Sequence, residues 1–224
     1  MRPIGLTLLA LTLLAPRPAS AQRLPTGVMP SHYDLAFVVD LVHERFDGIE
    51  TIRVQVDEPT AKVVLNAVEI QFREVTIGAG AAAQTATVGL DEAAQTATLT
   101  VPKPLAKGAT EIHVKFGGVL NTQLRGFYIS KTKLRKYAVT QFESTDARRA
   151  FPCFDEPAFK ATFGVTLTID RGDTAIANGR VLSDVSRRSD SYSGSDTLDT
   201  ALALVREQAD PLVAQLYNDY CRSR

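Results

Sequence analysis

Short runs of apolar and β-branched residues, separated by turn residues, fill the chain from Ser31 to about Ile169. Val, Ile, Phe and Thr dominate these runs, and such residues are enriched in β-strands. Helical periodicity is absent over this stretch, so the pattern predicts an all-β domain, a multi-stranded sandwich or saddle, and argues against a βαβ fold. The expected strands are Tyr33–Val42, Phe46–Val56, Lys62–Val68, Glu69–Ile77, Gln95–Val101, Thr110–Phe116 and Tyr137–Glu143.

Glycines and prolines mark the turns that we expect between these strands. Residues 79–86 are small and alanine-rich, so a helix and a loose hairpin are both plausible there. The segment from Thr145 to Arg149 suits one helical turn, which Pro152 would end. The turn positions are Asp47-Gly48, Gly78-Ala79-Gly80, Pro102, Pro104 and Gly117-Gly118.

The character of the sequence changes after Asp184. Serines alternate with Arg and Asp over residues 185–195, a composition typical of a solvated linker. Apolar residues then recur at helical spacing over residues 196–224, which predicts a short C-terminal α-helical tail, either a hairpin or a kinked helix. Asp196 can cap its first helix, and Asp210 before Pro211 can begin a second one.

Residues 1–21 have the layout of a secretory signal peptide, with Arg2, an apolar stretch and Ala19-Ser20-Ala21 before the expected cleavage point. A membrane anchor is the alternative. The apolar stretch from Ile4 to Ala15 is shorter than the roughly 20 residues that a spanning helix requires. We therefore expect a secreted or periplasmic protein with no membrane partner, whose β domain occupies residues 22–184.

Composition excludes several classes of protein. The 224 residues carry 25 basic and 25 acidic side chains, and a chain without net charge or a basic block gives no reason to expect a nucleic-acid partner. The runs Lys131 to Lys136 and Arg187-Arg188 are interpreted as solvated surface. Two cysteines are too few for a disulfide scaffold. An oxidising compartment would permit a bridge between Cys153 and Cys221, but a buried free Cys153 is the favoured interpretation.

The segment from Tyr137 to Phe163 is the densest in aromatic and charged residues, and it holds five of the ten phenylalanines. On an extended strand Gln141 and Glu143 project to the same side, because side chains two residues apart share a face. These polar side chains could meet solvent, pair with Arg148 or Arg149, or line a binding surface. Asp155 and Glu156, which we interpret as structural together with both arginines, offer carboxylates nearby.

The same segment resembles the N-terminal domain of the aminopeptidase N-like zinc metallopeptidases. The family pattern reads roughly T-Q-F-E-x-x-x-A-R-x-x-F-P-C-F-D-E-P-A-x-K-A-x-F, and this chain matches it from Thr140 to Phe163. Further agreement covers about residues 24–184, which implies the saddle-like β domain of that family. It comes from Leu24-Pro25, Pro30-Ser31-His32-Tyr33-Asp34-Leu35, Leu65-Asn66-Ala67, Gly126-Phe127-Tyr128, Asn178-Gly179 and Ser183-Asp184.

The resemblance implies roles for two residues. Glu143 would help to hold the free α-ammonium of a peptide substrate, and Gln141 would line the pocket for its first side chain. A carboxylate about 4 Å from an ammonium gains on the order of 4 kcal/mol at an effective dielectric constant of 20, before desolvation is subtracted. The implied partners are therefore peptides with a free N-terminus. The alternative is that Glu143 only pairs with Arg148 or Arg149.

The catalytic signatures of the family are missing from the sequence. Its zinc ligands and general base lie in an H-E-x-x-H motif with a downstream Glu. His43-Glu44 begins such a motif, but position 47 is Asp, and His32 belongs to a stretch that we interpret as structural. The Gly-Ala-Met-Glu-Asn substrate loop is also absent, since the only methionines are Met1 and Met29. We therefore expect no catalytic residue and no metal ligand in this chain, zinc being the cofactor of the full-length family.

Three hypotheses follow for function. The chain is one part of a secreted zinc aminopeptidase, whose catalytic domain is supplied elsewhere and without which it does not hydrolyse peptides. Alternatively, it is a non-catalytic β module that binds peptides or proteins, or a non-functional fragment whose exposed interface promotes aggregation. The abrupt change after about Val185 suggests a truncated, re-spliced or frameshifted product of a longer gene.

Overall fold

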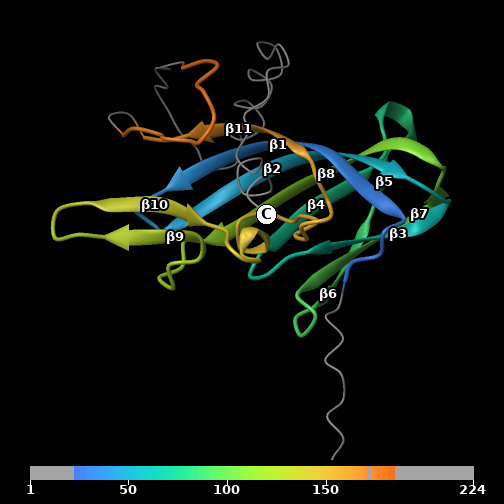
Figure 1. The fold of residues 1–224 in the computed structure, drawn as a ribbon, viewed down its shortest axis with the longest axis horizontal. Helices are drawn as coiled ribbons and strands as arrows, with labels where there is room; N and C mark the ends of the chain where they lie inside the picture. The colour runs from blue at the N-terminus through green and yellow to red at the C-terminus, as the bar shows by residue number, and fades with distance from the viewer. Residues whose placement is uncertain (1–22, 171–172, 185–224) are drawn as a thin grey trace, which may run out of the picture.

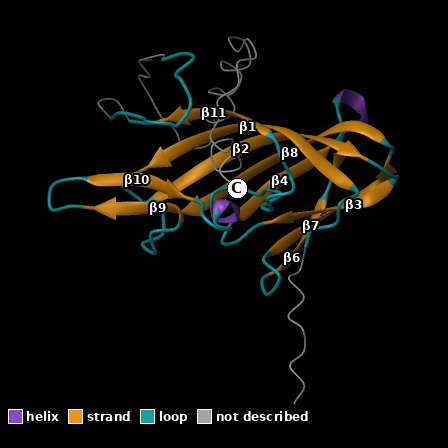
Figure 2. Ribbon diagram, viewed as in Figure 1, coloured by secondary structure: helices purple, strands orange, loops and turns teal. Residues whose placement is uncertain are grey.

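The computed structural model describes residues 23–170 and 173–184 and confirms the all-β fold (Figure 1). The described residues form eleven strands and two short 3₁₀-helices, and Figure 2 shows that strands dominate. The strands are β1 Val28–Asp40, β2 Arg45–Val56, β3 Thr60–Asn66, β4 Gln71–Ile77, β5 Gln84–Thr85, β6 Thr87–Asp91, β7 Thr96–Leu105, β8 Gly108–Val119, β9 Gly126–Lys131, β10 Lys136–Gln141 and β11 Thr162–Thr168. The 3₁₀-helices are η1 Gly80–Ala82 and η2 Ala147–Arg149.

A six-stranded sheet with the order β11-β1-β2-β8-β4-β5 forms the body of the domain. Its strands pair antiparallel except β11, which lies parallel to β1. A three-stranded sheet, β3-β7-β6, and a hairpin, β9-β10, complete the fold. In Figure 1 the hairpin lies at the left of the molecule, and β3 and β7 lie at the right. This arrangement makes β10 a strand of a small separate sheet, whose end carries the candidate site.

The core lies on the inner face of the large sheet. Alternation along β2 buries Phe46, Ile52 and Val54 on this face, because successive side chains of a strand point to opposite sides. Phe37 of β1 contacts the rings of Phe46 and Phe116 edge to face, with both centroid separations 6.0 Å. Such aromatic pairs add a modest stabilisation beyond the apolar area that they bury.

Two expected turns are wrong, because their glycines lie inside strands. Asp47-Gly48 lies within β2, and Gly117-Gly118 lies within β8. A Cβ atom on Gly48 would lie 2.4 Å from Cζ of Phe116, and one on Gly118 would lie 2.4 Å from Cζ of Phe46. These glycines therefore leave room for aromatic rings on the neighbouring strand. The chain between β1 and β2 instead turns over residues 41–44, where Glu44 has a φ of 56°.

Other predictions of local structure are mostly confirmed, with shifted boundaries. Residues 79–86 form both a 3₁₀-turn, η1, and the short strand β5, so each alternative holds for part of the segment. The helical turn expected at Thr145–Arg149 is η2. Strand β7 runs through Pro102 and Pro104, which were expected to end it. Strand β10 ends at Gln141, two residues earlier than expected.

Several predictions concern residues outside the described part of the chain. They are the signal peptide at 1–21, the linker at 185–195 and the helical tail at 196–224, and Cys221 also lies there. Cys153 is a buried free thiol, as favoured from the sequence. Neither of the two short helices in residues 23–170 and 173–184 has the length or apolarity to cross a bilayer. The domain boundaries stay predictions.

Candidate functional site

Gln141 and Glu143 lie at the end of the β9-β10 hairpin. Gln141 is the last residue of β10 and pairs with Gly126, the first residue of β9. Glu143 follows in a turn over residues 143–146, and its peptide bond to Ser144 is cis. Both side chains are exposed. The hairpin thus presents one amide and one carboxylate, two residues apart, to the surroundings of the domain.

Buried Arg149 anchors the turn that carries Glu143. Its Nε donates a hydrogen bond of 2.9 Å to Oδ1 of Asp146, and its guanidinium also forms an ion pair of 3.0 Å with Glu69. The backbone N–H of Asp146 donates to the carbonyl of Phe142 at 3.0 Å and closes the turn. The Phe142 ring contacts Phe151 edge to face. The position of Glu143 is therefore fixed by contacts on either side of it.

Gly126 connects this anchor to the strand that carries Gln141. Its φ of 66° lies in the left-handed region that glycine tolerates best. A Cβ atom at this position would lie 2.5 Å from Cβ of Arg149. The start of β9 therefore packs directly against Arg149. Arg149 thus contacts both the strand that pairs with Gln141 and the turn that carries Glu143.

Arg148 and Arg149 have partners other than Glu143. Arg148 donates to Oδ2 of Asp155 at 2.9 Å and to Oε1 of Gln95 at 3.0 Å. In the described part of the chain, no hydrogen bond or ion pair joins Glu143 to another side chain, so the alternative in which it only neutralises an arginine is wrong. The Glu143 carboxylate is thus exposed and has no charged partner among the described residues.

The structural interpretation of Asp155 and Glu156 is confirmed. The Asp155 side chain is only 1% exposed; burial raises the pKa of this carboxyl, and the hydrogen bond from Arg148 opposes that rise. The Glu156 carboxylate accepts a hydrogen bond from the backbone N–H of Leu24. Residue Asn66 pairs through its backbone with Cys153, at 2.7 and 3.0 Å. Hydrogen bonds thus join the segment after Phe151 both to the end of β3, at Asn66, and to the chain before β1, at Leu24.

The histidines are dispersed and do not form a metal site. His43 lies in the turn between β1 and β2 and contacts the Asp40 carboxylate at 2.7 Å. His32 contacts Thr162, and His113 contacts Thr51, on strands of the large sheet. Among residues 23–170 and 173–184, no three His, Cys, Asp or Glu side chains lie close enough together to hold a metal ion. The described residues do not fit a zinc site.

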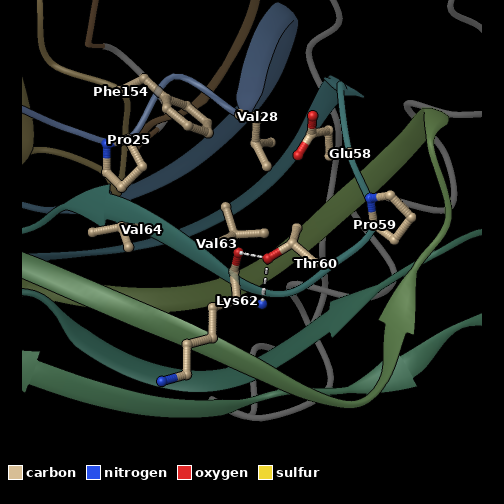
Figure 3. A pocket seen from close by; sticks show the side chains of 10 residues that line it. Pro25, Val28, Glu58, Pro59, Thr60, Lys62, Val63, Val64 and Phe154 are labelled. Atoms are coloured by element: carbon tan, nitrogen blue, oxygen red, sulfur yellow. Dashed lines mark hydrogen bonds between the residues drawn. The ribbon is translucent and has the colours of Figure 1, made fainter.

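A shallow groove of about 270 Å³ opens between the start of β1 and strand β3 (Figure 3). It is lined by Pro25, Gly27, Val28, Glu58, Pro59, Thr60, Lys62, Val63, Val64 and Phe154. Glu58 and Lys62 are its charged lining residues, and Figure 3 shows the hydroxyl of Thr60 hydrogen-bonded to the backbone of Lys62. Neither Gln141 nor Glu143 contributes to this groove, so it is separate from the candidate site.

The sequence did not predict which residues position Gln141 and Glu143. The sequence placed Asp146 and Arg149 in a helical turn but did not predict their ion pair. Gly126 was noticed only as part of a matching motif, because glycine tolerates a positive φ but the sequence does not show that this residue adopts one. Glu69 lies in the chain between β3 and β4, and nothing in its local sequence points to Arg149.

Comparison with known proteins identifies a family and several relatives of this chain. The peptidase M1 N-terminal domain family matches residues 29–194. A puromycin-sensitive aminopeptidase of Caenorhabditis elegans is 37% identical over 170 residues, 73% of this chain and 18% of that protein. Endoplasmic reticulum aminopeptidase 1 of Homo sapiens is 35% identical over 173 residues, with the same coverages of 73% and 18%. The mitochondrial aminopeptidase 2 of Saccharomyces cerevisiae is 38% identical over 162 residues, 69% of this chain and 17% of that protein. The chain thus spans less than a fifth of the length of these relatives.

Proposed function

This chain belongs to the peptidase M1 N-terminal domain family, and on that premise we propose that it is the substrate-binding N-terminal domain of a secreted zinc-dependent aminopeptidase. The full enzyme removes N-terminal amino acids from peptides, and this domain supplies one side of its site. The leader-like residues 1–21 support the proposal of secretion. The names of the relatives, all aminopeptidases, support the reaction class.

The free carboxylate of Glu143 is the observation that carries the proposal. It is exposed, it has no partner among the described residues, and its turn is anchored by Arg149. A carboxylate held in this way attracts the α-ammonium of a peptide and gains nothing from an internal peptide bond. Gln141, two residues earlier in the chain, lines the space for the first side chain of that peptide. The pair would thus select for a free N-terminus.

Zinc and the groups that activate water belong to another domain in this proposal. The sequence contains no H-E-x-x-H motif, and the described residues do not fit a metal site. By itself the chain therefore binds substrate N-termini without cleaving them. Adding zinc and an aminoacyl chromogenic substrate to the purified chain is expected to give no turnover, and turnover abolished by a chelator would contradict this assignment.

Peptide titration tests the role of Glu143 directly. We expect a peptide with a free N-terminus to bind about fivefold more tightly than its N-acetylated form, which corresponds to about 1 kcal/mol for an exposed ion pair. Glu143→Gln is expected to abolish this preference. Glu92→Gln, which changes another exposed glutamate in the turn before β7, is the matched control and should retain it.

The acetylation preference also separates this proposal from a general binding module. Equal affinity for both peptides, unchanged by Glu143→Gln, would indicate peptide or protein binding without recognition of the N-terminus. Gln141→Ala is expected to change the affinity for peptides with different first residues while it leaves the acetylation preference intact. Loss of all binding in a folded Gln141→Ala variant would instead assign the main contact to Gln141.

A further inference from the structure

Glu50 places a carboxyl group in the centre of the apolar core. It lies in β2, opposite Leu35 of β1 and Val114 of β8, and none of its surface is exposed. Alternation along β2 puts it on the same inner face as Phe46 and Ile52. Because none of its surface is exposed on this face, the side chain cannot reach solvent unless the packing over the sheet opens.

Within the described residues, no hydrogen-bonding group offsets the burial of this carboxyl. Both Oε atoms of Glu50 lack a hydrogen-bond partner among the described residues. An ionised carboxylate in such surroundings is strongly disfavoured, whereas the neutral acid is tolerated far better. Burial accordingly raises the pKa of Glu50 well above 4.5, its ordinary value. Glu50 thus differs from Asp155, which is also buried but receives two hydrogen bonds from Arg148.

The groups that face Glu50 cannot supply a positive charge. Tyr33 of β1 and Cys153 interact electrostatically with it, and both are acids whose pKa values burial also raises. The Tyr33 hydroxyl already accepts a hydrogen bond from the backbone N–H of Phe154. Arg148 acts on Cys153, but its guanidinium is bonded to Asp155, whose negative charge also faces Tyr33 and Cys153. The buried side chains of β8 are apolar: Ile112, Val114 and Phe116.

We propose that Glu50 is a pH-sensitive switch in the β domain, protonated while the core is closed and ionised when the large sheet opens. Below the ordinary pKa of a glutamate both states hold the proton, and the closed fold has its full stability. As pH rises above that value, the opened state releases the proton while the closed state retains it, so opening becomes more favourable. The loss continues until the pH reaches the pKa of the buried group.

This change of stability with pH is opposite in sign to that of a carboxylate in an ion pair, which stabilises the fold more as pH rises. In the window between the two pKa values, the equilibrium constant for unfolding is expected to rise by up to about tenfold per pH unit through this one group. The domain would then be most stable against unfolding in mildly acidic solution and less stable at neutral pH. The inference does not depend on the proposed peptide binding.

Urea unfolding of the full chain between pH 5 and pH 8 tests the switch. The unsubstituted chain is compared with Glu50→Leu, which removes the titration, and with Glu50→Gln, which keeps the shape. Both variants should become more stable relative to the unsubstituted chain as pH rises. The ratio of the unfolding equilibrium constants, unsubstituted chain over variant, should increase by up to about tenfold per pH unit. Glu58→Gln, an exposed position, should show a pH-independent difference. A pH-independent difference for Glu50→Leu and Glu50→Gln would overturn the proposal.

A second measurement does not require a folded variant. Infrared spectroscopy of the unsubstituted chain at pH 7 should show the carbonyl band of a protonated carboxyl group, which disappears on unfolding in urea at the same pH. Absence of this band from the folded chain at pH 7 would show that Glu50 is ionised in the closed core, and would overturn the proposal.

Discussion

Nε of Arg149 lies 2.9 Å from Oδ1 of Asp146, the last residue of the turn on which Glu143 lies. The Arg149 side chain is only 8% exposed, and its guanidinium also contacts the Glu69 carboxylate. One buried cation thus joins the chain between β3 and β4 to the turn after β10. The candidate site consists of exposed side chains, but its geometry depends on this buried contact.

Arg149→Gln is expected to destabilise the domain by about 2 kcal/mol. Breaking a fully buried ion pair typically costs roughly 3–5 kcal/mol, but Asp146 is 21% exposed and Glu69 58% exposed, so water compensates part of the loss. Urea unfolding at pH 7 measures the change. Arg53→Gln is the matched control, because its pair with Asp34 is half exposed on both sides and should contribute less than about 1 kcal/mol. Equal effects of the two substitutions would argue against the anchor.

Arg148→Met should destabilise the domain more at neutral than at acidic pH. The substitution leaves the Asp155 carboxylate buried without its main partner, a change that costs about 3–5 kcal/mol. Arg148 lowers the pKa of Asp155 against the effect of burial, so its loss raises that pKa further. The variant then loses stability as pH rises above 3.8, the ordinary pKa of an aspartate, because the folded state retains a proton that the unfolded state releases.

Urea midpoints at pH 5 and pH 8 would check this prediction. Asp155→Asn combined with Arg148→Met removes the titrating group, and the stability deficit of that double variant should not grow with pH. A deficit of Arg148→Met that is the same at both pH values would show that Asp155 reaches solvent or another cation when Arg148 is absent.

Most of the strand pattern could be predicted from the sequence, because alternation and β-branched residues report directly on a half-buried sheet. Strand β2 shows this well, since Phe46, Ile52 and Val54 repeat at even spacing on the buried face. The sequence interpretation failed at Gly48 and Gly118, where glycine usually indicates a turn. Here the glycines accommodate rings of Phe116 and Phe46 from a strand more than sixty residues away in the chain. Local patterns carry no information about such a neighbour.

The candidate site was predicted only in part for the same reason. The motif around Glu143 indicated which two side chains to consider, but the pairing of Arg148 and Arg149 depends on Gln95 and Glu69 from distant segments. Glu50 was not singled out from the sequence. The period of two from Phe46 nevertheless places it on the buried face of β2, where the structure shows it fully buried.

Gly48→Ala is expected to destabilise the domain by about 1–3 kcal/mol. The added Cβ would lie 2.4 Å from the ring of Phe116, so the aromatic cluster or the strands must shift, as in other overpacked cores. Gly89→Ala in β6 is the matched control, because its nearest non-neighbouring heavy atom would be 3.9 Å away. That substitution should be neutral or slightly stabilising. Thermal unfolding of both variants measures the contrast, and Phe116→Leu should relieve the effect of Gly48→Ala if the clash is its cause.

The tether between the β1–β2 turn and the β9-β10 hairpin should weaken in acid. Glu44 binds both Lys131 and Lys136, and hydrogen bonds from these lysines lower its pKa below 4.5. A lowered pKa contributes stability that is complete above 4.5 and is lost as pH falls through the folded value. Glu44→Gln should therefore speed amide hydrogen exchange in β9 and β10 at pH 6, after correction for the intrinsic rate, and the difference from the unsubstituted chain should shrink below pH 4. Because the pair is exposed, high salt should also reduce the difference. A difference that persists unchanged at pH 3 and in high salt would assign the effect to the shape of the side chain and not to its charge.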